Sequence, residues 1–279
     1  MKKWNLIVDV ANCTNCNLCT LAVQDEHVGN AFPGYAEEMP KHGHRWIEIH
    51  RRERGTGPAT DVAYLATMCQ HCDDAPCIAA APDAIAKRDD GIVIIDPVKS
   101  KGRREIVDSC PYGAIWWNEE KQVPQHWFFD AHLLDAGWAE PRCVTVCATN
   151  ALKAVKLDDS DMQRLIEDEG LEPLRPDLAT KPRVYYKNLW RYTKAFVAGT
   201  VSAKKDGTVD CLEGATITLA RDGQEIARQQ TDPFGDFKID RLDAGAYEVN
   251  ITAPGYAAAS VKLTLDDAQN IGDVRLAPA

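Results

Sequence analysis

Long apolar runs and positive charge are both scarce in this chain of 279 residues. No run approaches the roughly 18 to 20 apolar residues of a membrane-spanning helix, so we predict no direct membrane insertion. The formal net charge is -10, which argues against nucleic acid as a partner and leaves proteins or small molecules. At this length the chain can bury two separate hydrophobic cores.

The N-terminus also lacks the apolar segment and cleavage site of a secretory signal. Residues 1–10 instead pass directly into the alternation typical of a β-strand. Disulfides need an oxidising compartment, so we expect free cysteines and a cytoplasmic location. A folded subunit can nevertheless be exported together with a partner that carries a signal, and that alternative stays open.

Ten cysteines are present, and nine of them precede residue 150 in spaced groups. In chain order these groups are Cys13-x2-Cys16-x2-Cys19, Cys69-x2-Cys72-x4-Cys77, Cys110-Pro111 and Cys143-x3-Cys147, with Cys211 alone. Three thiolates on one short loop, completed by a distant cysteine, form the ligand pattern of a 4Fe-4S cluster. Zinc prefers paired C-x2-C knuckles and is the weaker interpretation.

Two positions where the ferredoxin pattern expects a cysteine hold other residues. The first position follows Cys19 after three residues and holds Val23. The second lies after the second triplet, directly before a proline, and holds Ala81. Neither side chain can ligate iron. Two full triplets and two crossing cysteines remain, and these match each other in number.

Nested pairing, in which the first group joins the last and the second joins the third, is the usual order in such chains. It assigns one 4Fe-4S cluster to Cys13, Cys16, Cys19 and Cys147, and a second to Cys69, Cys72, Cys77 and Cys110. Cys143 and Cys211 are left over. We predict that both are small buried hydrophobic side chains.

A different pattern begins near residue 195. Short alternating runs at 215–220, 225–230, 237–239 and 247–251 are separated by turn residues. They predict a small antiparallel β-sandwich or barrel, and the stretch 234–256 resembles the transthyretin-like or carboxypeptidase-regulatory-like fold. No catalytic constellation occurs in it, so we expect a structural or docking module.

The fold class is therefore α+β, with two nested ferredoxin-like iron-sulfur units followed by the β-sandwich. We predict a ferredoxin-like domain at 1–158, a helix and wrapping linker at 159–194, and the β-sandwich at 195–279. The helix is expected at 160–169 and ends at Gly170. The aromatic residues of the linker could pack on a partner subunit or on the ferredoxin-like domain.

Several stretches outside the cysteine triplets are distinctive. They are Asp25-Glu26-His27, Pro33-Gly34-Tyr35, Gly43-His44-Arg45-Trp46, Arg51-Arg52-Glu53-Arg54-Gly55, Gly91-Ile92-Val93-Ile94-Ile95-Asp96-Pro97, Cys110-Pro111-Tyr112-Gly113, Ala131-His132-Leu133-Leu134-Asp135 and Lys181-Pro182-Arg183-Val184-Tyr185-Tyr186-Lys187-Asn188-Leu189. With the nested cysteines they resemble the iron-sulfur β subunits of the dimethyl sulfoxide reductase family of molybdopterin enzymes. More narrowly, they resemble the small subunits of the pyrogallol-phloroglucinol transhydroxylase group, over nearly the whole chain.

Members of this narrow group carry three 4Fe-4S clusters, and the sequence departs from the group at one of them. Where the group has two cysteines before the Ala131–Asp135 stretch, this chain has Trp127 and Asp130. Their crossing partner is Val23, so of four ligands only Cys143 survives. Because three ligands are lost together, we predict two clusters in this chain.

The vacated volume needs to be filled, because a cavity of that size is destabilising. We expect Trp127, Phe128 or Phe129 to fill it. The alternative is that His126, Asp130 and Cys143 retain a single metal ion there, since carboxylate and imidazole can bind iron or zinc.

The resemblance implies a separate large subunit that holds a pterin-bound molybdenum or tungsten, with the first cluster placed toward it. We therefore predict no catalytic residues on this chain, which would be an electron-transfer or structural subunit of an enzyme acting on phenolic aromatics. Transfer of a hydroxyl between two phenols exports no net electrons and so tolerates a missing middle cluster. The alternative is an electron-exporting subunit of a resorcinol-hydroxylase-like enzyme or another family member. A stand-alone carrier is less favoured, because the segments 29–68 and 170–194 exceed what cluster loops need.

Overall fold

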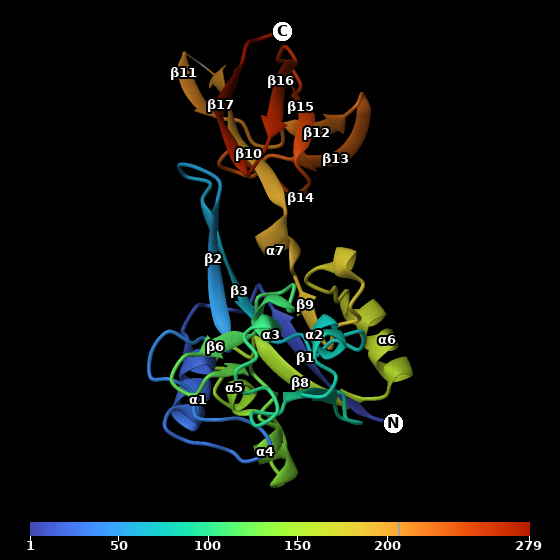
Figure 1. The fold of residues 1–279 in the computed structure, drawn as a ribbon. Coiled ribbons are helices and arrows are strands. Elements are labelled where there is room, and N and C mark those ends of the chain that lie inside the picture. The colour runs from blue at the N-terminus through green and yellow to red at the C-terminus, as the bar shows by residue number, and fades with distance from the viewer. Residues whose placement is uncertain (206) are drawn as a thin grey trace. The chain divides into compact units, whose positions relative to one another are not determined.

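The computed structural model describes residues 1–205 and 207–279, and the chain forms two compact units. Unit 1 comprises residues 1–51 and 64–189, and unit 2 comprises residues 52–63 and 190–279. Figure 1 shows the elements of each unit. Among the described residues, no helix has the length and apolarity that crossing a membrane would need.

The central element of unit 1 is a three-stranded sheet in which β1 (Lys3–Asp9) lies between β8 (Leu152–Leu157) and β9 (Val184–Lys187). β1 runs antiparallel to β8 and parallel to β9. The strand expected near the N-terminus is thus confirmed, but residues 5–8 are all buried rather than alternating. Ile7 packs against Met162, whereas Val8 lines a cavity on the cysteine side, so both faces of the strand are covered.

Short helices and hairpins surround this sheet. The helices are α1 (Leu18–His27), α2 (Pro76–Ala80), α3 (Glu105–Asp108), α4 (Ala131–Asp135), α5 (Arg142–Thr145), α6 (Asp159–Glu169) and the 3-10 helix η1 (Pro176–Leu178). The hairpins pair β2 (Glu48–Arg54) with β3 (Asp61–Thr67), β4 (Ile85–Lys87) with β5 (Val93–Ile95), and β6 (Trp116–Asn118) with β7 (Val123–Gln125).

The helix expected at 160–169 is α6. It starts at Asp159, because the Asp158 side chain accepts the Asp161 backbone N–H at 2.9 Å and so caps the first turn. It ends at Gly170, whose φ of 61° closes the helix in the left-handed region. The residues after it, up to Leu189, belong to unit 1.

Unit 2 is a sandwich of two four-stranded sheets, preceded by α7 (Trp190–Thr193). In one sheet β10 (Ala195–Lys205) pairs with β11 (Thr208–Cys211), β14 (Asp236–Leu242) and β17 (Gln269–Leu276). The other has the order β13 (Gln224–Gln230), β12 (Thr216–Arg221), β15 (Gly245–Thr252) and β16 (Ala259–Leu265). The four predicted runs correspond to β12, β13, β14 and β15, and the sandwich is confirmed. One pair departs from the expected pattern, since β17 runs parallel to β10.

The inner faces of the two sheets form the hydrophobic core of unit 2. Side chains such as Ile217, Leu219, Phe237 and Val249 come from facing strands and are almost fully buried. Alternation along each strand therefore produces this core, as in other sandwiches.

The contacts of Arg54 explain why residues 52–63 belong to unit 2, although the rest of that unit begins more than a hundred residues later in the chain. Its guanidinium is fully buried, pairs with Asp61, and donates to Asp240 at 3.1 Å and to the Lys194 carbonyl at 3.0 Å. It also lies 5.3 Å from the ring centroid of Phe196. A buried cation needs such partners, so this network fixes the hairpin tip in unit 2.

Candidate iron-sulfur sites

Pairing of β1 with β8 brings the first and last cysteine groups together. Val8 lies opposite Leu152, and the Asp9 backbone N–H donates to the Ala151 carbonyl at 2.7 Å. The loop of residues 13–19 leaves the end of β1, while Cys147 stands just before the start of β8. Two segments more than 120 residues apart are thus held side by side by the ends of one strand pair.

All four cysteines of the predicted first quartet line one cavity, with an empty volume of about 350 Å³. These are Cys13, Cys16, Cys19 and Cys147; the rest of the lining is mostly apolar and includes Val8, Ile49, Ala66, Ala151 and Leu152. Asn15 and Asn17 turn the loop with φ values of 59° and 61°, which asparagine tolerates better than most residues. The Asn17 side-chain amide donates to the Asn15 carbonyl at 2.9 Å and stabilises that turn.

The four cysteines of the predicted second quartet line a separate cavity, with an empty volume of about 390 Å³. These are Cys69, Cys72, Cys77 and Cys110. Cys77 follows Pro76, the first residue of α2, and Cys110 comes shortly after α3. Both pack against a small apolar core that includes Ile85, Val93 and Ile106. The β4–β5 hairpin and the two short helices therefore position this quartet.

The thiols of each quartet interact mainly with one another. Burial, followed by the neighbouring thiols of Cys13 and Cys147, raises the pKa of Cys19 to about 11. Burial, followed by Cys110 and Cys72, raises the pKa of Cys77 to about 11. Four thiolates in one apolar cavity repel one another unless a cation compensates their charge. Four soft sulfur donors in a cavity of this kind fit a 4Fe-4S cluster.

Two histidines lie beside the second quartet. The ligand atoms of Cys69, His71 and His126 are within 4.8 Å of one another. His71 Nδ1 accepts the Val93 backbone N–H at 3.1 Å, and His126 Nε2 donates to the Val93 carbonyl at 3.0 Å. Burial lowers the pKa of His126 to about 4 and that of His71 well below its usual value, so both are neutral.

The single-metal alternative required His126, Asp130 and Cys143 to meet. Among the described residues the ligand atoms of these three do not gather within 4.8 Å of one another, since the one such group is Cys69, His71 and His126. The alternative is therefore wrong in its ligand set. His126 directly follows β7 and faces the second cavity, where its Nε2 bonds to the carbonyl of Val93 in β5.

The residues of the predicted vacated site are all buried. Val23, Trp127, Asp130 and Cys143 each expose 1% of their surface or less. Trp127 stacks on Phe129 with ring centroids 4.8 Å apart, and both rings lie within 6 Å of His71. Of the two positions where cysteines are absent, one thus holds a packed aromatic ring, Trp127, and the other holds the carboxylate of Asp130.

Asp130 is held in an unusual conformation at this site. Phe129 and Asp130 have φ values of 62° and 50°, and Asp130 Oδ2 accepts the Arg142 backbone N–H at 2.9 Å. Its other oxygen lies 3.7 Å from His27 Nε2, which is too long for a hydrogen bond. The carboxylate therefore fixes the start of α5, and with it the position of Cys143.

The two leftover cysteines have different environments. Cys143 is fully buried, as predicted, and burial with the nearby Asp130 carboxylate raises its pKa well above the usual value. Cys211 is exposed, so the prediction that it is buried was wrong. It ends β11, a short edge strand whose four residues are all exposed.

The sequence analysis missed Lys87 and His71. Lys87 contacts the loop between Cys69 and Cys72, while His71 is part of that loop. A lysine at the end of a short strand carries no distinguishing pattern. The one available signal was its place between the second triplet and the crossing Cys110.

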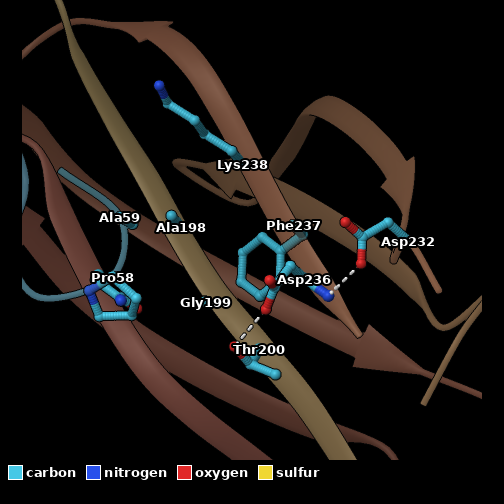
Figure 2. Close-up of a pocket in the computed structure, with 10 residues that line it drawn as sticks. Pro58, Ala59, Ala198, Gly199, Thr200, Asp232, Asp236, Phe237 and Lys238 are labelled. Atoms are coloured by element: carbon cyan, nitrogen blue, oxygen red, sulfur yellow. Dashed lines mark hydrogen bonds between the residues drawn. The ribbon is translucent and has the colours of Figure 1, made fainter. Parts of the chain in front are cut away.

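A further pocket lies in unit 2 (Figure 2). It is lined by Pro58, Ala59, Ala198, Gly199, Thr200, Asp232, Asp236, Phe237, Lys238 and Asn270. Thr200 donates to Asp236 at 2.6 Å, and Asp232 accepts the Asp236 backbone N–H at 2.9 Å. Because no lining residue is a cysteine or histidine, this pocket offers no thiolate or imidazole to iron.

Sequence comparisons match both units. A 4Fe-4S dicluster domain matches residues 60–157, and a carboxypeptidase regulatory-like domain matches residues 197–277. The chain is 43% identical to the pyrogallol hydroxytransferase small subunit of Pelobacter acidigallici, over 99% of this chain and 100% of that one. It is 31% identical to the thiosulfate reductase electron transfer subunit of Salmonella typhi, over 58% of this chain and 80% of that one.

A third relative is the putative iron-sulfur subunit of dimethyl sulfoxide reductase from Halobacterium salinarum, with 29% identity over 67% of this chain and 80% of that one. Among solved structures, 5-hydroxyisourate hydrolase of Klebsiella pneumoniae matches with 15% identity, a TM-score of 0.24, and coverage of 30% of this chain and 93% of that one. A likeness at that level carries no conclusion about this chain.

The chain belongs to the iron-sulfur small subunits of the dimethyl sulfoxide reductase family of molybdopterin enzymes. The resemblance indicated by the cysteine pattern is confirmed. The chain is thus an electron-transfer subunit of a multi-subunit enzyme, with 4Fe-4S cofactors.

We expect the thiols to differ sharply in alkylation. Iodoacetamide should modify the exposed Cys211 at least about 100-fold faster than the buried Cys143, because only an accessible thiolate reacts. Peptide mapping by mass spectrometry measures both rates in one sample. Equal rates for Cys211 and Cys143 would contradict the burial described above.

In the iron-free chain, the rate at which Cys19 is labelled should rise about tenfold per pH unit until the pH reaches its pKa of about 11.

Replacing Trp127 by alanine should destabilise the iron-loaded chain by about 3 to 5 kcal/mol, because a large ring is removed from a fully packed site. Trp138→Ala is the matched control, since Trp138 is 46% exposed and should cost less than about 1 kcal/mol. Urea denaturation followed by far-UV circular dichroism compares the two. Similar midpoints for both variants would show that Trp127 does not fill a volume on which the fold depends.

Proposed function

We propose that this chain is the iron-sulfur subunit of a heteromeric molybdopterin enzyme that transfers a hydroxyl group between phenolic aromatics. The observation that carries the proposal is the 43% identity to a pyrogallol hydroxytransferase small subunit across the full length of both chains. The catalytic pterin, with molybdenum or tungsten, would lie in a separate large subunit. Cytoplasmic location stays a prediction.

Two sets of four thiolates would hold the cofactors of this chain. The first set is Cys13, Cys16, Cys19 and Cys147, and the second is Cys69, Cys72, Cys77 and Cys110. Bound 4Fe-4S clusters would supply one-electron donor and acceptor sites. The rest of each cavity lining is mostly apolar, which supports this assignment because the apolar shell around such a centre controls solvent access and so its potential.

The residues at the positions of a third cluster do not form a set of four ligands. Val23, Trp127 and Asp130 occupy three of its positions, and Cys143 would be the only thiolate left at the site. One cysteine cannot hold a cubane that needs four ligands. Trp127 is fully buried and packs on Phe129, which favours two clusters over three.

The face that carries the first quartet is the proposed contact with the large subunit. Leu18 and Leu21 of α1 expose 38% and 53% of their surface, directly beside the exposed Cys16. Apolar side chains exposed next to a cofactor loop are typical of a subunit interface. This face would bring the first quartet close to the partner.

A lost middle cluster fits transhydroxylation better than net hydroxylation. Transfer of a hydroxyl between two phenols leaves no surplus electrons, so no continuous path to an external acceptor is required. A hydroxylase, by contrast, must discharge electrons at every turnover. The gap that a lost middle cluster would leave is therefore tolerated more easily in the first reaction.

A joint assay of iron and acid-labile sulfide tests the cluster count. The anaerobically purified complex should contain about eight irons on this chain after the iron of the large subunit is subtracted. Electron paramagnetic resonance during reductive titration should resolve two centres. About twelve irons would contradict the loss of the third site.

Matched cysteine variants assign the ligands. Cys77→Ala should remove about four irons, whereas Cys143→Ala and Cys211→Ala should remove none, because neither is in a full set of four thiolates. Loss of iron on Cys143→Ala would return that residue to the ligands and sink the assignment.

Activity with a defined substrate pair tests the reaction class. The complex of both subunits should convert pyrogallol to phloroglucinol, given the hydroxylated cosubstrate, with no added electron acceptor. Product analysis by liquid chromatography measures this, with complex lacking the small subunit as control. Turnover of resorcinol that depends on an added acceptor would instead favour the electron-exporting hydroxylase.

A further inference from the structure

Lys87, the last residue of β4, directs its ammonium at the loop that carries Cys69 and Cys72. Nζ donates to the carbonyl oxygens of His71 at 2.8 Å and Cys72 at 2.9 Å, and it lies 2.7 Å from Asp73 Oδ1. An ammonium has three donors and a neutral amine only two. Three acceptors at these distances therefore describe a charged lysine with every N–H in use.

The position of this charge is fixed from several sides. Lys87 pairs with Val93 in the β4–β5 hairpin, and the Val93 N–H donates to His71 Nδ1. The hairpin thus holds both the side chain of His71 and, through Lys87, its carbonyl. Only 19% of the Lys87 side chain is exposed, so its charge is weakly screened by solvent.

Other charged groups near Lys87 do not cancel its charge. Asp73 is shared with Arg183, which pairs with it through both Nε and Nη2. Arg183 also lies 2.8 Å from Asp159, and Lys3 lies 4.0 Å from Asp73. Because Asp73 divides its charge among several cations, Lys87 leaves a net positive field at the loop.

At the corresponding turn of the first quartet, the hydrogen-bond donor is a neutral amide. His71 and Asn15 stand at the same place between the first two cysteines of their triplets, and both have positive φ, 46° and 59°. The Asn15 carbonyl accepts from the neutral amide of Asn17, whereas the His71 carbonyl accepts from an ammonium. The corresponding turns of the two loops are thus stabilised differently, the first by a neutral donor and the second by a positively charged one.

We propose that Lys87 is a positioning residue that holds the second cysteine loop and, through its positive charge, raises the reduction potential of the cluster bound there. The proposal rests on the proposed assignment of Cys69, Cys72, Cys77 and Cys110 as ligands. Reduction adds one electron, and so one negative charge, while no atom is transferred and Lys87 keeps its protons. A fixed cation at the ligand-bearing loop stabilises that added charge.

The test is a reductive titration of the purified complex, followed by electron paramagnetic resonance, with Lys87→Met. Methionine keeps the length of the side chain but removes its charge. At the wild-type midpoint of the second centre, the ratio of reduced to oxidised cluster should fall about tenfold, which is 59 mV for one electron. The second centre is identified as the signal that Cys77→Ala removes. The first centre should change less than twofold and serves as the internal control.

Three further variants separate charge from loop support. Lys87→Arg keeps the charge and should stay within threefold of the wild-type ratio. Asp73→Asn removes the counter-charge and should shift the ratio the other way, toward the reduced cluster. Lys153→Met removes an exposed lysine of β8 and should leave both centres unchanged.

The sign of the Asp73→Asn shift decides between the two roles. A purely structural role would disturb the loop in both Lys87→Met and Asp73→Asn and would shift the two ratios in the same direction or not at all. Either result overturns the proposal, as does an unchanged ratio in Lys87→Met with its iron retained. If Lys87→Met loses four irons, the proposal is tested by the ratios of reduced to oxidised cluster measured in Asp73→Asn and Lys87→Arg.

Failure of the proposed function would be seen in a different measurement, the iron count of the wild-type complex. An iron count near twelve in the wild-type complex would contradict the two-cluster count, yet the second centre could still be followed through Cys77→Ala. A count near eight with no shift in any variant would overturn the role of Lys87 alone.

Discussion

Compensation of thiolate charge is the constraint on which unit 1 depends. Each cavity gathers four thiols from distant parts of the chain into apolar surroundings, where burial and mutual repulsion raise the pKa values of several of them. Strand pairing delivers the distant cysteine of the first set, and a small apolar core delivers that of the second. The fold brings the thiols together, and bound iron makes that arrangement electrostatically favourable.

Under the proposed loss of one cluster, the residues around Trp127 and Asp130 show how such a fold adapts when ligands are replaced. Trp127 and Phe129 supply volume, and Asp130 uses one oxygen to fix the start of α5. Adaptation is incomplete, because both ring nitrogens of His27 and one oxygen of Asp130 are buried without a hydrogen-bond partner among the described residues. Buried polar atoms of this kind lower the stability of the folded chain.

Unit 2 follows a different principle. Its two sheets are joined by a continuous apolar core, and the one fully buried charged side chain among its described residues is Arg54, whose Nη1 and Nη2 are hydrogen-bonded while Nε has no partner. Because the Arg54 partners come from residues 61, 194 and 240, the network closes only when the hairpin tip and the sandwich are both formed. The unit is thus a separately packed module with a contribution from an early part of the chain.

Sequence alone determined the ligand types, their spacing and the positions where cysteines are missing, because the chemistry of iron fixes which side chains can stand at short, regular intervals. The alternation of apolar and polar residues likewise predicted four strands of the sandwich, and the turn residue Gly170 helped to predict the ends of α6 to within one residue. Tertiary structure alone decided that Cys211 is exposed, that His126 faces the second cavity, and that Lys87 reaches the His71 carbonyl. Burial and long-range charge contacts depend on which strands become edges and which loops meet. Those outcomes arise from the packing of the whole chain and leave no local pattern.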